Sequence, residues 1–255
     1  MKRLNIKRKS NGFTLIELIG VMAIMAILAG ALAPNIADSI NRANSDAEVQ
    51  NLDSLANSLI YYILTKKKIP SSSPSSWVNA IATNSMFQEE RIKYNVKGYQ
   101  RILIFDPRFF SNNKDNNFTG YTQNKGLANS PFSPRMMLIS SLTGNIPSIG
   151  NKASIFNAIW DQKNAPVLME SKNLKIKRIN VAKKFHRIIL SNAKSNKTFY
   201  QLENGSKVTV PAKSNGVNGM LTRYILGSTK LSLYNTTGKL VDVRVIQSDW
   251  SYQYN

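Results

Sequence analysis

The segment that decides the fold of this chain is Gly12-Phe13-Thr14-Leu15-Ile16-Glu17-Leu18. It opens an apolar stretch of 21 residues, from Phe13 to Ala33, in which Glu17 carries the only charge. A helix needs about 20 apolar residues to cross the hydrocarbon core of a bilayer. Residues 13–33 are therefore predicted to form a transmembrane or filament-core helix.

Glu17 is a candidate functional residue because of where it lies. A carboxylate inside a membrane span is unfavourable unless it finds a partner, so such residues usually have a role. Cleavage between Gly12 and Phe13 would create a cationic amine on Phe13, near Glu17 of the same or a neighbouring subunit. We expect this amine to supply the counter-charge.

Residues 1–12 form a basic leader that contains no acidic residue. Its cations are Lys2, Arg3, Lys7, Arg8 and Lys9. Because the cytoplasmic flanks of membrane helices are enriched in Lys and Arg, the N-terminus is expected in the cytoplasm. We therefore expect a single-pass membrane protein, with its C-terminal domain in the periplasm or its equivalent.

The leader, the cut site and the span resemble the processing and assembly signature of type IV pilins and type II secretion pseudopilins. In this resemblance Gly12 precedes the cleaved bond, and Phe13 becomes the N-methylated first residue of the mature chain. Glu17 matches the assembly glutamate, and Pro34 matches a proline at which the family's helix often bends or melts. The larger remainder resembles the C-terminal domain of a minor pseudopilin.

The resemblance implies a structural subunit with no enzymatic activity and no cofactor, held in the bacterial inner (cytoplasmic) membrane. It would be a minor pseudopilin of a type II secretion-like or type IV pilus-like filament. Its implied partners are other pilin-like subunits, a prepilin peptidase, an inner-membrane assembly platform with its ATPase, and membrane lipid. Two alternatives stay open: a DNA-binding competence pilin, and a membrane-anchored binding protein or adhesin that does not polymerise.

Two simpler interpretations of the N-terminus explain less of the sequence. A cleaved secretory signal would use Ala31-Leu32-Ala33, but such signals have apolar regions of about 7–15 residues, and Pro34 would follow the cut. An ordinary signal anchor explains the length and the basic flank. It leaves the Gly-Phe-Thr-Leu-Ile-Glu string unexplained.

Beyond Pro34 the apolar residues recur at spacings of mostly three or four, which predicts an amphipathic helix over residues 34–66. Pro34 is expected to bend this helix, and Lys66-Lys67-Lys68 with Pro70 are expected to end it. The apolar stripe consists of Ile36, Ile40, Ala43, Ala47, Leu52, Leu55, Leu59, Ile60 and Ile63. The charged residues Asp38, Arg42, Asp46, Glu48 and Asp53 fall largely between these positions.

Residues 67–255 are predicted to form a globular domain, mixed in its first part and antiparallel β in its second. The whole chain is therefore α+β, with a long helical spine. Short helices are expected over 77–84, capped by Ser76, and over 154–160. Strands are expected over 101–105, 136–142, 185–190, 198–202, 207–210, 224–226, 231–234 and 240–246. Residues 112–130 are expected to be an exposed loop, and 203–206 and 235–238 hairpin turns.

The residue types present argue against catalysis and metal binding. The chain has no cysteine, so it can form neither a disulfide nor a thiolate metal site. His186 is the only histidine, and it lies in a basic run where a surface or strand-face position is expected. Neither an acidic calcium loop nor a glycine-rich phosphate loop is present.

The chain is strongly basic, with a formal net charge of +20. Such a charge fits contact with nucleic acid, anionic lipid or an acidic partner, although a solvated face is the preferred interpretation. The densest run includes Phe185 and forms a candidate patch for an anionic partner or single-stranded nucleic acid. One aromatic residue is weak support, so nucleic acid is not favoured. The cations of the run are Lys172, Lys175, Lys177, Arg178, Lys183, Lys184 and Arg187.

Overall fold

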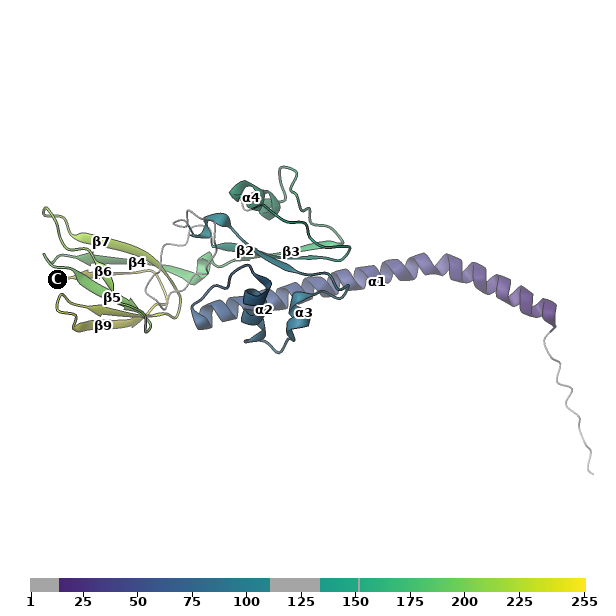
Figure 1. The fold of residues 1–255 in the computed structure, drawn as a ribbon, viewed down its shortest axis with the longest axis horizontal. Helices are drawn as coiled ribbons and strands as arrows, with labels where there is room; N and C mark the ends of the chain where they lie inside the picture. Colours follow the sequence, from purple (N-terminus) through teal and green to yellow (C-terminus); the bar gives the residue numbers. More distant parts are fainter. Residues whose placement is uncertain (1–13, 111–133, 151) are drawn as a thin grey trace, which may run out of the picture. The chain divides into compact units, whose positions relative to one another are not determined.

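The computed structural model describes residues 14–110, 134–150 and 152–255 and shows an α+β fold (Figure 1). The chain divides into two compact units, Met1–Asn44 and Ser45–Asn255. The helix α1, Leu15–Lys66, contributes to both units. The three β-sheets formed by the described residues lie in the second unit.

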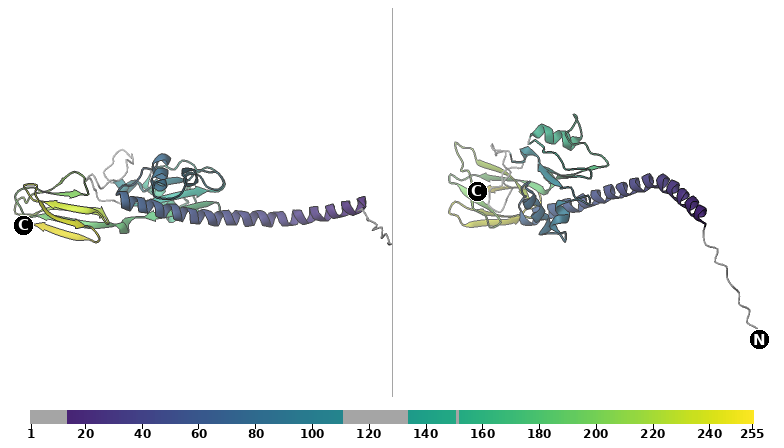
Figure 2. Two further views of the ribbon diagram at one scale, coloured as in Figure 1. Left: turned by 90° about the horizontal axis from the view of Figure 1, so that it is seen from below. Right: turned by 45° about the vertical axis from the view of Figure 1, so that its right-hand side comes forward.

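The helix α1 continues through Pro34, as the sequence predicts. Proline removes one helical hydrogen bond and crowds the preceding turn. Figure 2 shows the N-terminal part of α1 as an unbroken, curved helix. The helix ends at Lys66 because Lys67 adopts a left-handed backbone, with a φ of 52°. Lys67 Nζ donates a 2.6 Å hydrogen bond to the Gly227 carbonyl, which ties the helix end to the turn that follows β7.

An antiparallel sheet of order β1-β2-β3 forms the middle layer of the second unit. Its strands are β1 (Ile102–Phe105), β2 (Arg135–Ser141) and β3 (Leu174–Asn180). The central strand β2 is buried on both faces, because its residues alternate between two hydrophobic clusters. Met136 and Leu138 join the cluster that includes α1, and Met137 and Ile139 pack with helix α4, Ala153–Asp161.

Two further sheets complete the second unit. One has the order β10-β4-β7 and the other the order β6-β5-β8-β9. Their strands are β4 (Phe185–Asn192), β5 (Thr198–Leu202), β6 (Val208–Val210), β7 (Gly219–Leu226), β8 (Lys230–Tyr234), β9 (Leu240–Val245) and β10 (Trp250–Tyr254). All pairs are antiparallel except β10 with β4, which run parallel. The remaining elements are α2 (Pro74–Ala82), α3 (Glu89–Lys93) and the short 3-10 helices η1 (Pro107–Phe110) and η2 (Ala182–Lys184).

One continuous hydrophobic cluster joins the helical and β parts of the second unit. On the α1 side its members repeat every three or four residues, at Leu52, Leu55, Leu59 and Ile63. The earlier part of the predicted stripe is different, since Ile36 and Ile40 are exposed, as are Ala43 and Ala47. The buried stripe of α1 therefore begins only at Ser45.

The structure corrects several local predictions. Ser73, not Ser76, is the N-cap of α2, because Pro74 fits the first turn of a helix, where its missing N–H is not needed. Strands β3 and β10 were not predicted, and β10 makes its sheet mixed instead of purely antiparallel. The loop expected at 112–130 lies outside the described residues.

Candidate functional site

The first turn of α1 is closed by reciprocal hydrogen bonds between Thr14 and Glu17. The backbone N–H and the hydroxyl of Thr14 donate to Glu17 Oε2 at 2.9 and 2.8 Å. The Glu17 N–H donates in turn to Thr14 Oγ1 at 3.3 Å. Thr14 is thus the N-cap and Glu17 the third residue of the helix, the arrangement known as a capping box. It satisfies two N–H groups that a helix start otherwise leaves without partners.

Glu17 therefore has hydrogen-bond partners within its own subunit, in addition to any that assembly supplies. The predicted site omits Thr14, although Thr14-Leu15-Ile16-Glu17 has the Ser/Thr-x-x-Glu spacing that precedes an apolar run in such caps. The carboxylate thus offers two separable properties, a cap for the helix and a negative charge. Glutamine would keep the first and remove the second, because capping boxes accept Glu or Gln.

The predicted processing residues, Gly12 and Phe13, lie outside the described residues. The same is true of the leader cations Lys2, Arg3, Lys7, Arg8 and Lys9. Their roles stay predictions.

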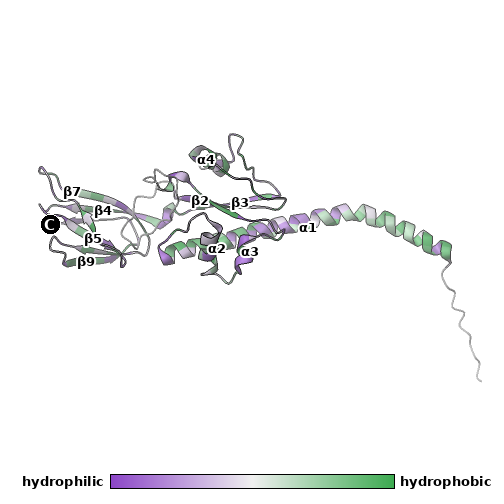
Figure 3. Cartoon of the chain, in the orientation of Figure 1, coloured by the Kyte–Doolittle hydropathy of each residue, from purple (hydrophilic) through white to green (hydrophobic). Residues whose placement is uncertain are grey.

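The N-terminal part of α1 presents an apolar surface on all sides. Its large apolar side chains from Leu15 to Ile40 are between 46% and 78% exposed. Figure 3 shows most of the N-terminal part of α1 in the hydrophobic colour. Among the described residues, α1 is the single helix long and apolar enough to cross a membrane. A helix without a polar face is stable in lipid or among other apolar helices.

In the second unit, α1 is held by a buried ion pair between Glu48 and Arg101. Arg101 Nε and Nη2 donate to the two Glu48 carboxylate oxygens at 2.6 and 2.7 Å. Arg101 Nη1 donates to the carbonyls of Arg91, Ile92 and Tyr94. Both charged side chains are at most 2% exposed. The sequence pattern placed Glu48 among the charged residues between the apolar positions, but Glu48 is buried. Its partner Arg101 lies 53 positions away in the sequence, so the local pattern could not reveal the pair.

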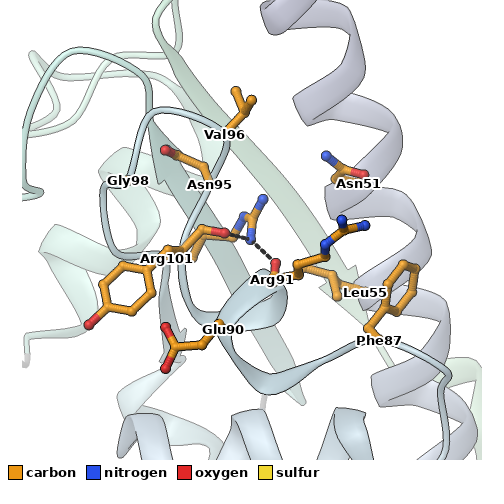
Figure 4. Close-up of a pocket in the computed structure, with 10 residues that line it drawn as sticks. Asn51, Leu55, Phe87, Glu90, Arg91, Asn95, Val96, Gly98 and Arg101 are labelled. Atoms are coloured by element: carbon orange, nitrogen blue, oxygen red, sulfur yellow. Dashed lines mark hydrogen bonds between the residues drawn. The ribbon is translucent and has the colours of Figure 1, made fainter.

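A cavity of about 620 Å³ opens beside this ion pair, lined by residues of α1, α3 and the segment that follows α3 (Figure 4). Leu55, Phe87 and Val96 supply apolar lining, and Glu90 and Arg91 supply charges of opposite sign. Arg101 also lines the cavity, but its Nη1 is occupied by backbone carbonyls. The lining contains neither histidine nor a hydroxyl nucleophile other than the Tyr94 phenol, so it offers no catalytic arrangement.

A second charged cluster links η1, β2 and α4. Asp106 accepts hydrogen bonds from the guanidinium groups of Arg108 and Arg135, at 2.8 and 2.6 Å from their Nη2 atoms. Both guanidinium groups also donate to Asn157 Oδ1. Burial raises the pKa of the Asp106 carboxyl, but the hydrogen bonds from the two arginines outweigh it and hold the pKa below its ordinary value.

The structure divides the basic run at 172–187 between different surroundings. Lys177 pairs with Asp53 of α1 at 2.6 Å, and Lys175 lies two residues earlier along β3. Arg178 pairs with Glu170 and donates to the Trp160 carbonyl. Lys183 and Lys184 lie in η2, and Arg187 is exposed in β4. Phe185 is buried, so its ring is not presented for base stacking.

No catalytic or metal-binding arrangement is found in the described part of the chain. His186 is half-buried in β4, and its Nδ1 lies 3.9 Å from Asp249 Oδ1. Over residues 14–110, 134–150 and 152–255, no group of three or more His, Asp or Glu residues could hold a metal ion.

Comparison with known proteins points to the same N-terminal feature. Residues 7–33 match the family model of the prokaryotic N-terminal methylation motif. The chain is 31% identical over 99 residues to type II secretion system core protein G of Pectobacterium carotovorum subsp. carotovorum, covering 39% of this chain and 62% of that protein. It is 30% identical over 101 residues to the protein of that name from Aeromonas hydrophila, covering 40% and 69%. No solved structure matches the chain.

The chain spans 62% of the first relative and 69% of the second. The methylation motif overlaps the apolar part of α1, since residues 7–33 include the first part of that helix. The motif, the α+β fold and the sequence identities agree with one another. The chain belongs to the family of type IV pilins and type II secretion pseudopilins.

Proposed function

We propose that this chain is a structural subunit of a type II secretion-like filament, released from its leader by cleavage between Gly12 and Phe13 and methylated on Phe13. The observation that carries the proposal is the first part of α1, from Leu15 to Ala33, whose large apolar side chains are exposed and whose only charge is Glu17 in the first turn. Such a helix can be held in lipid before assembly and among like helices afterwards.

We infer that Glu17 supplies the charge that fixes subunits in register. A buried cationic amine at Phe13 is unfavourable without a counter-ion, and Glu17 of a neighbouring subunit would provide one. The hydrogen bonds from Thr14 reach only Oε2 of this carboxylate among the bonds described. Its other oxygen would accept the neighbour's amine without loss of the cap. Pro34 would let the helix bend as it packs.

The remaining partners follow from this role. A prepilin peptidase would recognise the leader, and an inner-membrane platform with its ATPase would drive assembly. The basic leader would keep the N-terminus in the cytoplasm, with the first part of α1 in the inner membrane and residues 67–255 as the periplasmic domain. In this division residues 13–33 are the membrane or filament-core segment, and 34–66 join it to the domain.

We propose a minor rather than a major subunit. The match to the core protein G relatives covers 39–40% of this chain, so most of the chain is additional to what they share with it. A filament built mainly of this subunit would have to accommodate the additional part of the chain in every one of its subunits. A subunit used in few copies avoids that restriction.

A DNA-binding role is less favoured. Phe185 is buried, and both Lys177 and Arg178 have acidic partners within the chain. A non-polymerising adhesin would have no use for a charge at Glu17. Binding of a single-stranded oligonucleotide at physiological salt by the full chain in detergent would support the DNA-binding role.

The decisive variants separate the charge of Glu17 from its cap. Glu17→Gln keeps an acceptor for Thr14 but removes the charge. Thr14→Val removes the hydroxyl cap but keeps the carboxylate. Each variant would carry Ile24→Cys, an exposed position of α1 in a chain that otherwise lacks cysteine, and disulfide crosslinking would be measured in cells with the complete machine.

We expect Glu17→Gln to be processed and inserted yet to lose crosslinking between subunits, and Thr14→Val to retain it. The reverse result would mean that Glu17 acts only as a helix cap. Equal crosslinking in both variants and the parent would remove the carboxylate from assembly and favour an anchored binding protein.

A further inference from the structure

The edge strand β9 carries an apolar surface that no other described strand covers. It is the last strand in the sheet order β6-β5-β8-β9, and Figure 1 shows it at the margin of its sheet. Val241, Val243 and Val245 are 47%, 43% and 52% exposed. The unpaired N–H and C=O groups of an edge strand form a template for another chain, and exposed apolar side chains favour the pairing.

Another edge of the same molecule is protected in the usual way. The edge strand β3 carries Lys175 and Lys177, and charged side chains, lysine above all, discourage the addition of a further strand. In β9 the corresponding alternate positions are valines. Of these two edges, β9 is therefore the one more open to the addition of a strand.

The backbone of β9 presents polar groups to a new strand at its valines. The N–H of Ile246 donates to the Thr229 carbonyl and so faces the side of β8. Successive residues of an antiparallel strand point their N–H groups in opposite directions. The N–H groups of Val245 and Val243 therefore point away from β8, toward the open edge. The Val243 N–H accordingly donates to Asp242 Oδ1, at 2.8 Å, and not to β8.

The sequence of β9 is complementary to itself when two copies run antiparallel. If Val243 of one copy faces Val243 of the other, Asp242 lies opposite Arg244 on both sides, and Val241 lies opposite Val245. Opposite charges facing each other across two strands are stabilising. Arg244 already lies at this edge, with its guanidinium 4.8 Å from the ring centroid of Trp250.

We propose that β9 pairs antiparallel with β9 of a second copy of this chain, centred on Val243. The Val243 N–H groups would then leave Asp242 and donate to each other's carbonyls, which frees Asp242 for Arg244 of the second copy. Val241 is the extra residue of a register irregularity opposite β8, so it lies at the end of the paired segment. A two-fold contact of this kind closes on itself and adds no third copy. It is a contact of subunits outside the filament, and it does not depend on Glu17.

The test uses the absence of cysteine from the chain. Val243→Cys would place two thiols opposite each other on the two-fold axis, and facing residues of a hydrogen-bonded antiparallel pair have Cα atoms about 5.5 Å apart. That separation suits a disulfide. The full chain in detergent micelles would be oxidised, and the dimer fraction measured on non-reducing gels. Met220→Cys is the matched control, since Met220 is 64% exposed on another edge strand, β7.

We expect a disulfide dimer with Val243→Cys and monomer with Met220→Cys. Adding Asp242→Arg should weaken dimerisation about tenfold, because two attractive cross-strand pairs become repulsive. Adding Arg244→Asp as well should restore dimerisation, because position 242 then again faces an opposite charge at position 244 of the second copy. This recovery is expected only for the two-fold antiparallel register. Equal crosslinking at positions 243 and 220 would overturn the proposal, and so would failure of the charge exchange to restore the dimer. Glu17→Gln in the Val243→Cys chain should leave the dimer unchanged, which separates this contact from filament assembly.

Discussion

Replacing Arg101 by leucine tests whether the Glu48–Arg101 ion pair holds α1 in the second unit. The substitution leaves the Glu48 carboxylate fully buried without its cation. It also removes the donor of the Arg91, Ile92 and Tyr94 carbonyls. Breaking one side of a buried ion pair typically lowers the free energy of unfolding by about 3–5 kcal/mol.

The expected shift in melting temperature follows from the size of the unit. For a unit of this size, 1 kcal/mol corresponds to about 2–4 °C. Arg101→Leu should therefore lower the melting temperature by about 6–20 °C. Adding Glu48→Leu should recover part of this loss, because it removes the unpaired charge but leaves the three carbonyls without their donor.

The measurement is thermal unfolding of the full chain in detergent, followed by fluorescence of Trp77, which is fully buried, together with the two other tryptophans. The control is Asp53→Ala, which breaks the ion pair with Lys177. Those side chains are 49% and 38% exposed, and such pairs contribute at most about 1 kcal/mol. If Arg101→Leu shifts the melting temperature no more than Asp53→Ala, the buried pair does not hold the helix.

Three further substitutions probe the second unit. The pKa of Asp106 lies below its ordinary value, so its stabilising contribution is present above about pH 3.9 and is lost as the pH falls below that value. Asp106→Asn should therefore flatten the acid side of the stability profile, measured as unfolding free energy between about pH 2 and 7; an unchanged acid slope would contradict this. Gly219→Ala should destabilise by about 1–3 kcal/mol in urea unfolding, because a Cβ would overlap the Pro211 carbonyl, and a neutral effect would be contrary to the structure. Leu59→Ala, at a fully buried position of α1, should lose about 2–5 kcal/mol, whereas a loss below 1 kcal/mol would mean that this face of α1 is not packed.

The long helix and most strands could be predicted because their signals are local. The apolar span, the three-to-four spacing up to Ile63 and the two-residue alternation from Phe185 each lie within one stretch of sequence. The end of α1 at Lys66 was predictable from the lysine run and Pro70. These features need no knowledge of distant partners.

The missed features depend on partners far away in the chain. Strand β3 shows no two-residue alternation, because its buried residues Ile176 and Ile179 are three positions apart and join different hydrophobic clusters, with charged residues between them. The pairing of β10 with β4 joins segments about 60 residues apart and fixes a parallel direction that no turn specifies. Glu48 appears solvated until Arg101 is placed beside it.

At the candidate site, the assembly role of Glu17 was predicted from the family resemblance. Its part in capping the helix was seen only in the structure. Thr14 was within reach of sequence analysis, because the spacing of Thr14 and Glu17 is itself the signal of a capping box. The cap explains why an alanine at position 17 would change two properties at once. Only the glutamine variant isolates the charge.

The most direct test of the account is the N-terminus of the mature protein. The chain would be purified from membranes of cells that contain a prepilin peptidase, and its intact mass and N-terminal sequence determined, with Gly12→Val as the control that blocks cleavage. The account predicts a mature chain that begins at N-methylated Phe13, and a Gly12→Val chain that keeps its leader. A mature chain that begins at Pro34, or a wild-type chain that keeps residues 1–12, would contradict it.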